Sequence, residues 1–161
     1  MQTTPQMAKI VKGSTTADPK LPTKGIKPLK YDDKSAGQPL LANVFEQLSA
    51  ILRPYAKGSL HLQADGGGQL HLQTANTVGI PGEKKEGVHF ASLLVQKGYI
   101  GLYLMPIYVD PLLKNSTHPS LLQLLKGKSC FHIKKLDDTL KVHVENAIQA
   151  AYELYASKGL L

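Results

Sequence analysis

The stretch FASLLVQKGYIGLYLMPIYVD, residues 90–110, decides the fold of this 161-residue chain. Two apolar runs, 88–95 and 99–109, lie on either side of a short polar turn that contains a glycine. Such runs around a glycine-containing turn predict a β-hairpin at the centre of a sheet. Pro106 and Pro111 lack the N–H that pairs with a neighbouring strand, so strand pairing should end near them.

A two-residue turn at Lys97 and Gly98 would fix which side chains share a face of this hairpin. One face would be aliphatic, with these opposed pairs: Val95 and Ile100, Leu93 and Leu102, and Ala91 and Leu104. The other face would carry Phe90, Ser92 and Leu94 beside Tyr99, Gly101, Tyr103 and Met105. A glycine between two tyrosines would leave a depression in which a planar ligand could lie. The alternative is that a helix covers this face and the tyrosine hydroxyls reach only its rim.

A helix is predicted on each side of the sheet-forming region. Pro39 suits the first turn of a helix, and apolar residues recur at three- and four-residue spacing over 41–52. Pro54 should end that helix, because proline disfavours helical geometry in the residue before it. The closing helix should be capped by Asp137 or Asp138, which precede a second apolar stripe. Both helices are expected to pack on the sheet.

The sequence LHLQ occurs twice, at 60–63 and 70–73, and its alternating leucines predict two strands with one buried face. A three-residue loop, Gly66-Gly67-Gly68, would put all four leucines on that face, opposing Leu62 to Leu72 and Asp65 to Gln69. The other face would hold His61, Gln63, His71 and Gln73. These could form half of a metal site, although neutral exposed strand residues are far commoner. The polar stretch 77–87 would connect this hairpin to the central one.

Short helical segments are predicted after the central hairpin. Asp110 and Pro111 have the character of a helix cap and a first helical turn. Pro119 begins a second segment, which should run through four leucines to a stop at Gly127.

The segment KSCFHIK, residues 128–134, alternates like a strand with one buried face. Phe131 and Ile133 would face one way, and Cys130, His132 and Lys134 the other. Cysteine and histidine two residues apart can share a metal or form a nucleophile and its base, but a buried thiol and a hydrogen-bonded histidine are commoner. If a cavity lies over Tyr99, Tyr103 and Met105, the residues expected to line it are Lys128, Cys130 and His132.

Composition indicates one soluble domain. The chain is 42% hydrophobic, which suffices for one core. Cys130 is its single cysteine, so no intramolecular disulfide can form. No stretch has the ~20 apolar residues of a membrane span, and the first residues lack the apolar run of a secretion signal. We therefore expect a cytoplasmic protein without membrane contact.

The positive charge is concentrated in the first 38 residues. The net charge is +7, and residues 1–38 hold seven lysines against three aspartates. Prolines among Thr, Lys and Gly predict a flexible or extended basic arm over 1–38, followed by the folded domain over 39–161. The sequence shows no clustered basic stripe with stacking aromatic residues, so nucleic acid is disfavoured as a partner.

Two blocks carry a resemblance: YIGLYLMPIY at 99–108, and, after a helical insert, LLKGKSCFHIKKLDD at 124–138. With the closing helix, they resemble the YdhG-like family of small bacterial domains of unknown function. The similarity covers about residues 39–158. It implies an α+β domain with an antiparallel sheet and helices packed on it, and it implies that some relatives act as frataxin-like intracellular iron chaperones.

Four classes of function are compatible with these patterns. We expect a non-enzymatic module that binds a small ligand or a protein partner, with Tyr99, Gly101, Tyr103, Met105, Lys128, Cys130 and His132 as candidate site residues. Iron delivery is the main alternative, although iron favours carboxylate oxygens and the acidic residues of the two helices are scattered. Nucleic-acid binding and catalysis through Cys130 are the weaker alternatives. No catalytic residue, resident cofactor or oligomeric state is indicated.

Overall fold

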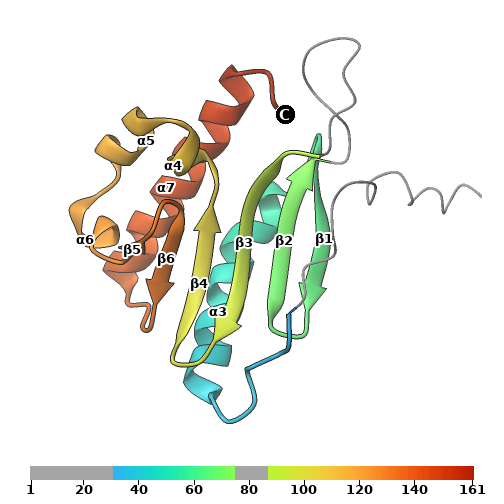
Figure 1. The fold of residues 1–161 in the computed structure, drawn as a ribbon, viewed down its shortest axis with the longest axis vertical. Coiled ribbons are helices and arrows are strands. Elements are labelled where there is room, and N and C mark those ends of the chain that lie inside the picture. Colours follow the sequence, from blue (N-terminus) through green and yellow to red (C-terminus); the bar gives the residue numbers. More distant parts are fainter. Residues whose placement is uncertain (1–30, 75–86) are drawn as a thin grey trace, which may run out of the picture.

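The structure is a computed structural model that describes residues 31–74 and 87–161. In these ranges, six antiparallel strands form one sheet in the order β1-β2-β3-β4-β6-β5. The strands are β1 (Leu60–Gly66), β2 (Gln69–Thr74), β3 (His89–Gln96), β4 (Tyr99–Leu104), β5 (Leu125–Lys126) and β6 (Cys130–Ile133). Two long helices, α3 (Pro39–Leu52) and α7 (Asp138–Ser157), lie behind the sheet in Figure 1. The predicted single α+β domain is confirmed.

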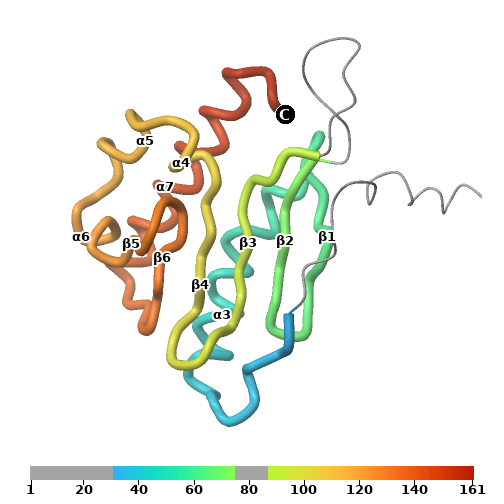
Figure 2. The backbone as a smooth tube through the Cα atoms, viewed as in Figure 1, coloured from blue at the N-terminus to red at the C-terminus, as the bar shows by residue number. Residues whose placement is uncertain are grey.

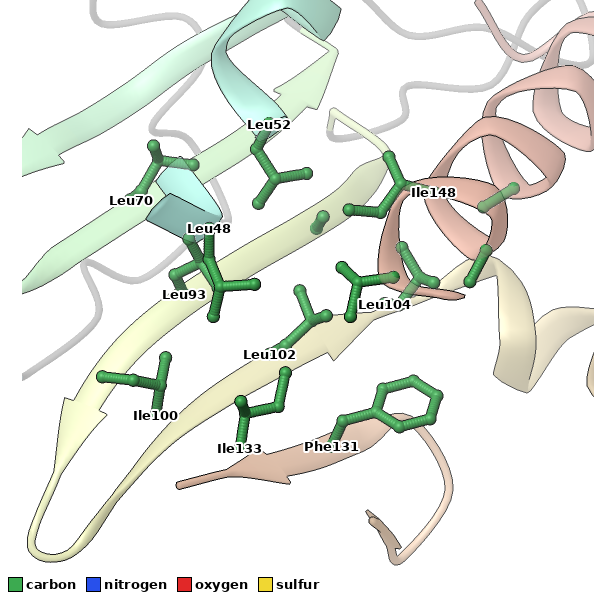
Figure 3. Packing of buried hydrophobic residues seen from close by; sticks show 14 of the residues in the cluster. Leu48, Leu52, Leu70, Leu93, Ile100, Leu102, Leu104, Phe131, Ile133 and Ile148 are labelled. Atoms are coloured by element: carbon green, nitrogen blue, oxygen red, sulfur yellow. The ribbon is translucent and has the colours of Figure 1, made fainter. Parts of the chain in front are cut away.

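The core fills the space between the sheet and the two long helices (Figure 3). Leu48 and Leu52 reach it from α3, and Ile148 reaches it from α7. The sheet supplies the aliphatic residues that alternate along its central strands, among them Leu93, Ile100, Leu102, Leu104 and Ile133, all at most 1% exposed. This burial follows from the hydrophobic stripes of the helices and the two-residue period of the strands.

The central hairpin has the predicted register. Its turn is Lys97-Gly98, and the three aliphatic pairs expected on the buried face are directly opposed: Val95 and Ile100, Leu93 and Leu102, and Ala91 and Leu104. Gly98 has a φ of 86°, which a glycine adopts without strain. β6 then pairs with β4, and Phe131 and Ile133 point into the core as predicted.

Phe90 was predicted on the wrong face. The pairing of β2 with β3 shifts between Leu72 and Gln73, which face Ala91 and His89, so Phe90 is an extra residue on β3. Such a β-bulge turns one side chain out of the alternation. Phe90 is fully buried on the helix side, with its ring centroid 5.7–6.4 Å from the rings of Tyr55, Tyr152 and Tyr155.

The first hairpin also has a different turn from the predicted one. Gly67 and Gly68 have φ values of 64° and 80°, and positive φ at both central residues makes a two-residue turn. Asp65 therefore faces Leu70 instead of Gln69, and a bulge at residue 63 restores the predicted pairing of Leu62 with Leu72. Because of that bulge, His71 lies opposite Ala64 and no longer faces Gln63, whereas His61 still faces Gln73 as predicted.

The link from β4 to β6 runs along one side of the sheet (Figure 2). It contains α4 (Pro106–Val109), α5 (Pro111–Ser116) and α6 (Pro119–Leu122). Asp110 caps α5 as predicted, accepting a 2.8 Å hydrogen bond from the Leu112 N–H. The helix predicted from Pro119 to Gly127 ends early, because Leu125 and Lys126 pair with β6 across the Gly127 turn. Of the two residues predicted as possible caps of α7, Asp137 is the cap, and the helix begins at Asp138.

The end of the predicted arm packs against the sheet. Tyr31 donates a 2.7 Å hydrogen bond to the Val95 carbonyl. The amide of Gln38 holds the central turn, because it donates to the Gln96 carbonyl at 3.0 Å and accepts from the Gly98 N–H at 2.8 Å. The folded part of the chain therefore includes residues 31–38. Residues 1–30 of the arm and almost all of the predicted 77–87 connection lie outside the described residues.

We expect Gln38→Ala to lower the free energy of unfolding by about 1–1.5 kcal/mol, because the partly buried Gln96 carbonyl and the exposed Gly98 N–H lose their partner. Gln47→Ala is the matched control, since among the described residues this amide bonds Asn43 alone, on the same exposed helix surface, and it should change the free energy of unfolding by less than about 0.5 kcal/mol. Urea denaturation followed by circular dichroism measures both. Equal unfolding midpoints for the two variants would contradict the role given to Gln38.

Candidate functional site

One face of the sheet carries the candidate site. The open face is the face opposite α3 and α7, and no helix within 31–74 or 87–161 lies over it (Figure 1). The strand registers place these side chains on it: Gln69, His71, Ser92, Leu94, Tyr99, Gly101, Tyr103, Lys126, Cys130 and His132. The predicted site residues Tyr99, Gly101, Tyr103, Cys130 and His132 are thus brought together.

Met105 and Lys128 are placed differently. β4 ends at Leu104, and Met105 has helical dihedral angles (φ −61°, ψ −38°) as the residue that precedes α4. Strand alternation therefore no longer applies to Met105, and its predicted position beside the tyrosines is not supported. The Lys128 ammonium lies 5.0 Å from the ring centroid of Tyr108, a residue of α4. Lys128 thus belongs to the end of the sheet next to α4.

Gly101 does not leave an open depression. A β-carbon at Gly101 would lie 3.1 Å from Cε2 of Tyr103 and 3.5 Å from Sγ of Cys130. The Tyr103 ring thus lies over the glycine and fills the space that the sequence predicted for a planar ligand. Glycine permits this close approach because it has no side chain of its own.

The phenol of Tyr103 and the thiol of Cys130 are held in their neutral forms. Burial, followed by the neighbouring Cys130 and Tyr99, raises the pKa of Tyr103 to about 12. Burial also raises the pKa of the Cys130 thiol, although contact with Tyr103 opposes this. Only a thiolate is a strong nucleophile, so this environment does not activate Cys130 for covalent chemistry.

Tyr99 and His132 form a stacked pair on the open face. Their ring centroids are 3.9 Å apart and their planes differ by 14°. His132 faces Gly101 across the ladder, so its ring lies diagonally beside Tyr99. Burial, Lys126 and Lys134 together lower the pKa of His132, which places two cations near a neutral imidazole.

A partly buried chain of hydrogen-bonded side chains occupies the other side of the open face, and the sequence did not predict it. The Ser92 hydroxyl is 2.7 Å from Nδ1 of His71 and 2.5 Å from Nε2 of His89, and Nε2 of His71 is 3.0 Å from Oε1 of Gln69. A carbonyl oxygen only accepts, so His71 donates from Nε2 and accepts the Ser92 O–H at Nδ1. The Ser92 oxygen then accepts from His89. These contacts can be predicted only when the pairing register of β2 with β3 is known. The polar sequence that connects the two strands does not determine that register.

Both histidines of this chain are neutral at physiological pH. Burial, with His71 as a second cause, lowers the pKa of His89 to about 4, and burial lowers the pKa of His71.

Serine beside a histidine is also the start of a catalytic arrangement. The Ser92 side chain is, however, only 4% exposed and has an imidazole on both sides, so a substrate cannot reach its oxygen. We therefore assign a structural role, and no catalytic one, to this hydrogen-bond chain.

A cleft of about 570 Å³ lies on the opposite side of the molecule, between α3 and α7. Its lining includes Ile51, Pro54 and Tyr55 with the charged residues Lys57, Lys141 and Glu145. The Tyr55 hydroxyl donates a 2.7 Å hydrogen bond to Gln149 at this site. None of the predicted site residues lines this cleft.

The acidic residues do not gather into an iron site within the described ranges, where no group of three or more His, Cys, Asp or Glu side chains is placed to hold a metal. Glu46 is instead 3.3 Å from Arg53, which also forms a two-bond contact with Asp65 at 3.0 Å. Glu153 accepts a hydrogen bond from Gln149. Iron delivery therefore stays a prediction from family resemblance alone.

None of the helices described is long and apolar enough to cross a membrane. No family model, no curated protein and no solved structure matches this chain, so the YdhG-like resemblance stays a prediction.

Proposed function

We propose that this protein is a non-enzymatic cytosolic binding module whose ligand or partner contacts the open face around Tyr99 and His132. The observation that carries the proposal is the stacked Tyr99–His132 pair on a sheet face without a described helix over it. The solvent face of an antiparallel sheet normally alternates to polar residues. Here it presents the half-buried rings of Tyr99, Tyr103 and His132 beside the half-buried thiol of Cys130. Partly exposed aromatic surface of this kind marks interaction sites.

Binding fits this surface better than catalysis does. The Cys130 pKa is raised, and the Ser92 hydroxyl is enclosed between two imidazoles. The Tyr103 ring covers Gly101, so the surface is flat rather than hollow at its centre. A flat aromatic surface suits a planar group that stacks on Tyr99 and His132, or a partner that lies across the strands.

Two-dimensional ¹H–¹⁵N spectra with a panel of planar aromatic fragments test this proposal. We expect the largest shifts at amides of β4 and β6. Tyr99→Ala should weaken binding by roughly 3–10-fold, the loss of about one stacking contact. Tyr108→Ala is the matched control, because Tyr108 is 52% exposed on α4 and outside the open face. Its affinity should match that of the unmodified protein.

The competing outcome has a clear signature. If the shifts gather instead on Ile51, Tyr55 and Gln149, the ligand site is the cleft between α3 and α7 and the proposal is wrong. Circular dichroism of Tyr99→Ala must show an unchanged fold for its loss of binding to count.

A further inference from the structure

We propose that the open face binds single-stranded nucleic acid, with the Tyr99–His132 pair stacking on a base and Lys126 and Lys134 contacting the flanking phosphates. The inference rests on the proposed function and names its partner. The sequence disfavoured nucleic acid because it showed no basic cluster joined to stacking aromatic residues. The fold assembles such a cluster from segments that are separated in the chain.

The aromatic part of the site comes from two neighbouring strands. Tyr99 begins β4 and His132 lies in β6, and their rings stack at 3.9 Å. Each ring uses one of its two faces in this pair. Both side chains are half-buried, so the rings are held in place and still reach the surface. Bases stack on such platforms with little dependence on sequence, because every base has a π face.

The charged part of the site borders this pair. Residues 124–135 hold four lysines and no acidic residue. Lys126 faces Cys130 in the register of β5 with β6, and Lys134 follows Ile133, which faces Ile100. Both lysines are exposed and close enough to His132 to affect its charge. Cations on both sides of a stacking platform are the arrangement expected where a phosphate chain passes over it.

Tyr99 and Lys134 lie at the same end of the sheet, where Tyr31 also packs. Tyr31 bonds the Val95 carbonyl, and Val95, Ile100 and Ile133 form one row across β3, β4 and β6. Tyr99 directly precedes Ile100 and Lys134 directly follows Ile133, so both residues adjoin this row. Two lysines that flank the ring pair suit successive phosphates of a strand better than the phosphate of one free nucleotide, so we assign the surface to a strand.

Fluorescence anisotropy of the full chain with a labelled oligothymidine of about 15 nucleotides tests the inference. We expect affinity to fall as KCl rises from about 50 to 200 mM. The double variant Lys126→Gln/Lys134→Gln should weaken binding by about 10-fold at low salt and reduce the salt slope by roughly 1.4, the value for two phosphate contacts. Tyr99→Ala should weaken binding by about 5-fold or more and leave the salt slope unchanged.

The matched control removes the same charge from the other side of the molecule. Lys57→Gln/Lys141→Gln changes two lysines of the cleft between α3 and α7 and should alter the affinity less than about twofold. An equal loss in both double variants would show that only net charge acts, and it would overturn the inference. Full competition by millimolar AMP would also overturn it, in favour of a free nucleotide. If the oligonucleotide does not bind while planar fragments still shift β4 and β6, the inference fails and the proposed function stands.

Discussion

Phe90→Ala should lower the free energy of unfolding by about 3–5 kcal/mol, the range for removing a large buried aromatic side chain. Phe90 is fully buried, and its ring packs against Tyr55, Tyr152 and Tyr155. The substitution removes contacts with η1 (Arg53–Tyr55) and α7 at once. The neighbouring structure can close only part of the cavity, because strand β3 is held on both sides by β2 and β4.

The size of this effect distinguishes whether the Phe90 side chain lies in the core or on the open face of the sheet. On the open face, where strand alternation predicted it, the ring would be partly exposed and its removal would cost much less. Leu62→Ala is the control, because Leu62 is 36% exposed on β1, and it should cost less than about 1 kcal/mol. Urea denaturation followed by circular dichroism measures both variants. A loss below about 1 kcal/mol for Phe90→Ala would contradict the bulge that turns this ring into the core.

Local patterns in the sequence were sufficient for most of the fold. The turn at Lys97-Gly98 fixed the register of the central hairpin, and the alternation of 128–134 fixed the faces of β6. The signals for helix starts were correct for the same reason, since caps and prolines act within one turn of the helix. Pro39 and Asp137 therefore mark the observed starts of α3 and α7.

The errors lie where a residue's position depends on a distant strand. Phe90 moves to the core because β2 pairs with β3 through a bulge, and neither strand shows this in its own sequence. The contact of Ser92 with His71 depends on the same pairing. Likewise, alternation put Gly101 between two tyrosines, but it did not indicate that the Tyr103 ring turns over the glycine. Side-chain direction on an open face is not set by alternation alone.

Folding stability should fall by up to about 3 kcal/mol as the pH drops from about 6.5 to about 4, because His89 stays neutral in the folded protein. Its pKa is lowered from 6.5 to about 4, mainly by burial. Between these values the unfolded chain binds a proton that the folded chain does not, so stability rises with pH. The contribution is complete above pH 6.5 and is lost toward pH 4. His71, whose pKa is also lowered, acts in the same direction.

The hydrogen-bond chain explains why a proton is poorly tolerated there. The Ser92 oxygen accepts from His89 and its hydroxyl donates to His71, so a proton added at Nδ1 of His71 would meet a hydroxyl that already points at it. Protonating His89 would place a cation beside His71 in a site with little water. A hydrogen bond with the Ala91 backbone favours the proton on His89, but burial outweighs it. The Tyr155 hydroxyl donates to the His89 carbonyl and gives the ring no negative charge.

His89→Gln should flatten the pH dependence between about 4.5 and 6.5, because glutamine keeps an N–H for Ser92 and does not titrate. The control His61→Gln changes an exposed histidine of β1 and should retain the slope of the unmodified protein. Urea denaturation at a series of pH values gives the free energy of unfolding against pH for the unmodified protein and the two variants. The effect of titrating carboxylates is the same in all three proteins, so it cancels when the curves are compared. If His89→Gln keeps the full slope, acid destabilisation arises elsewhere. If the slope is reduced, the titration of His89 causes most of the acid destabilisation, and the remaining slope is the share of His71. Neutral His89 then adds to the contact that Ser92 and His71 make between β3 and β2 above pH 6.5.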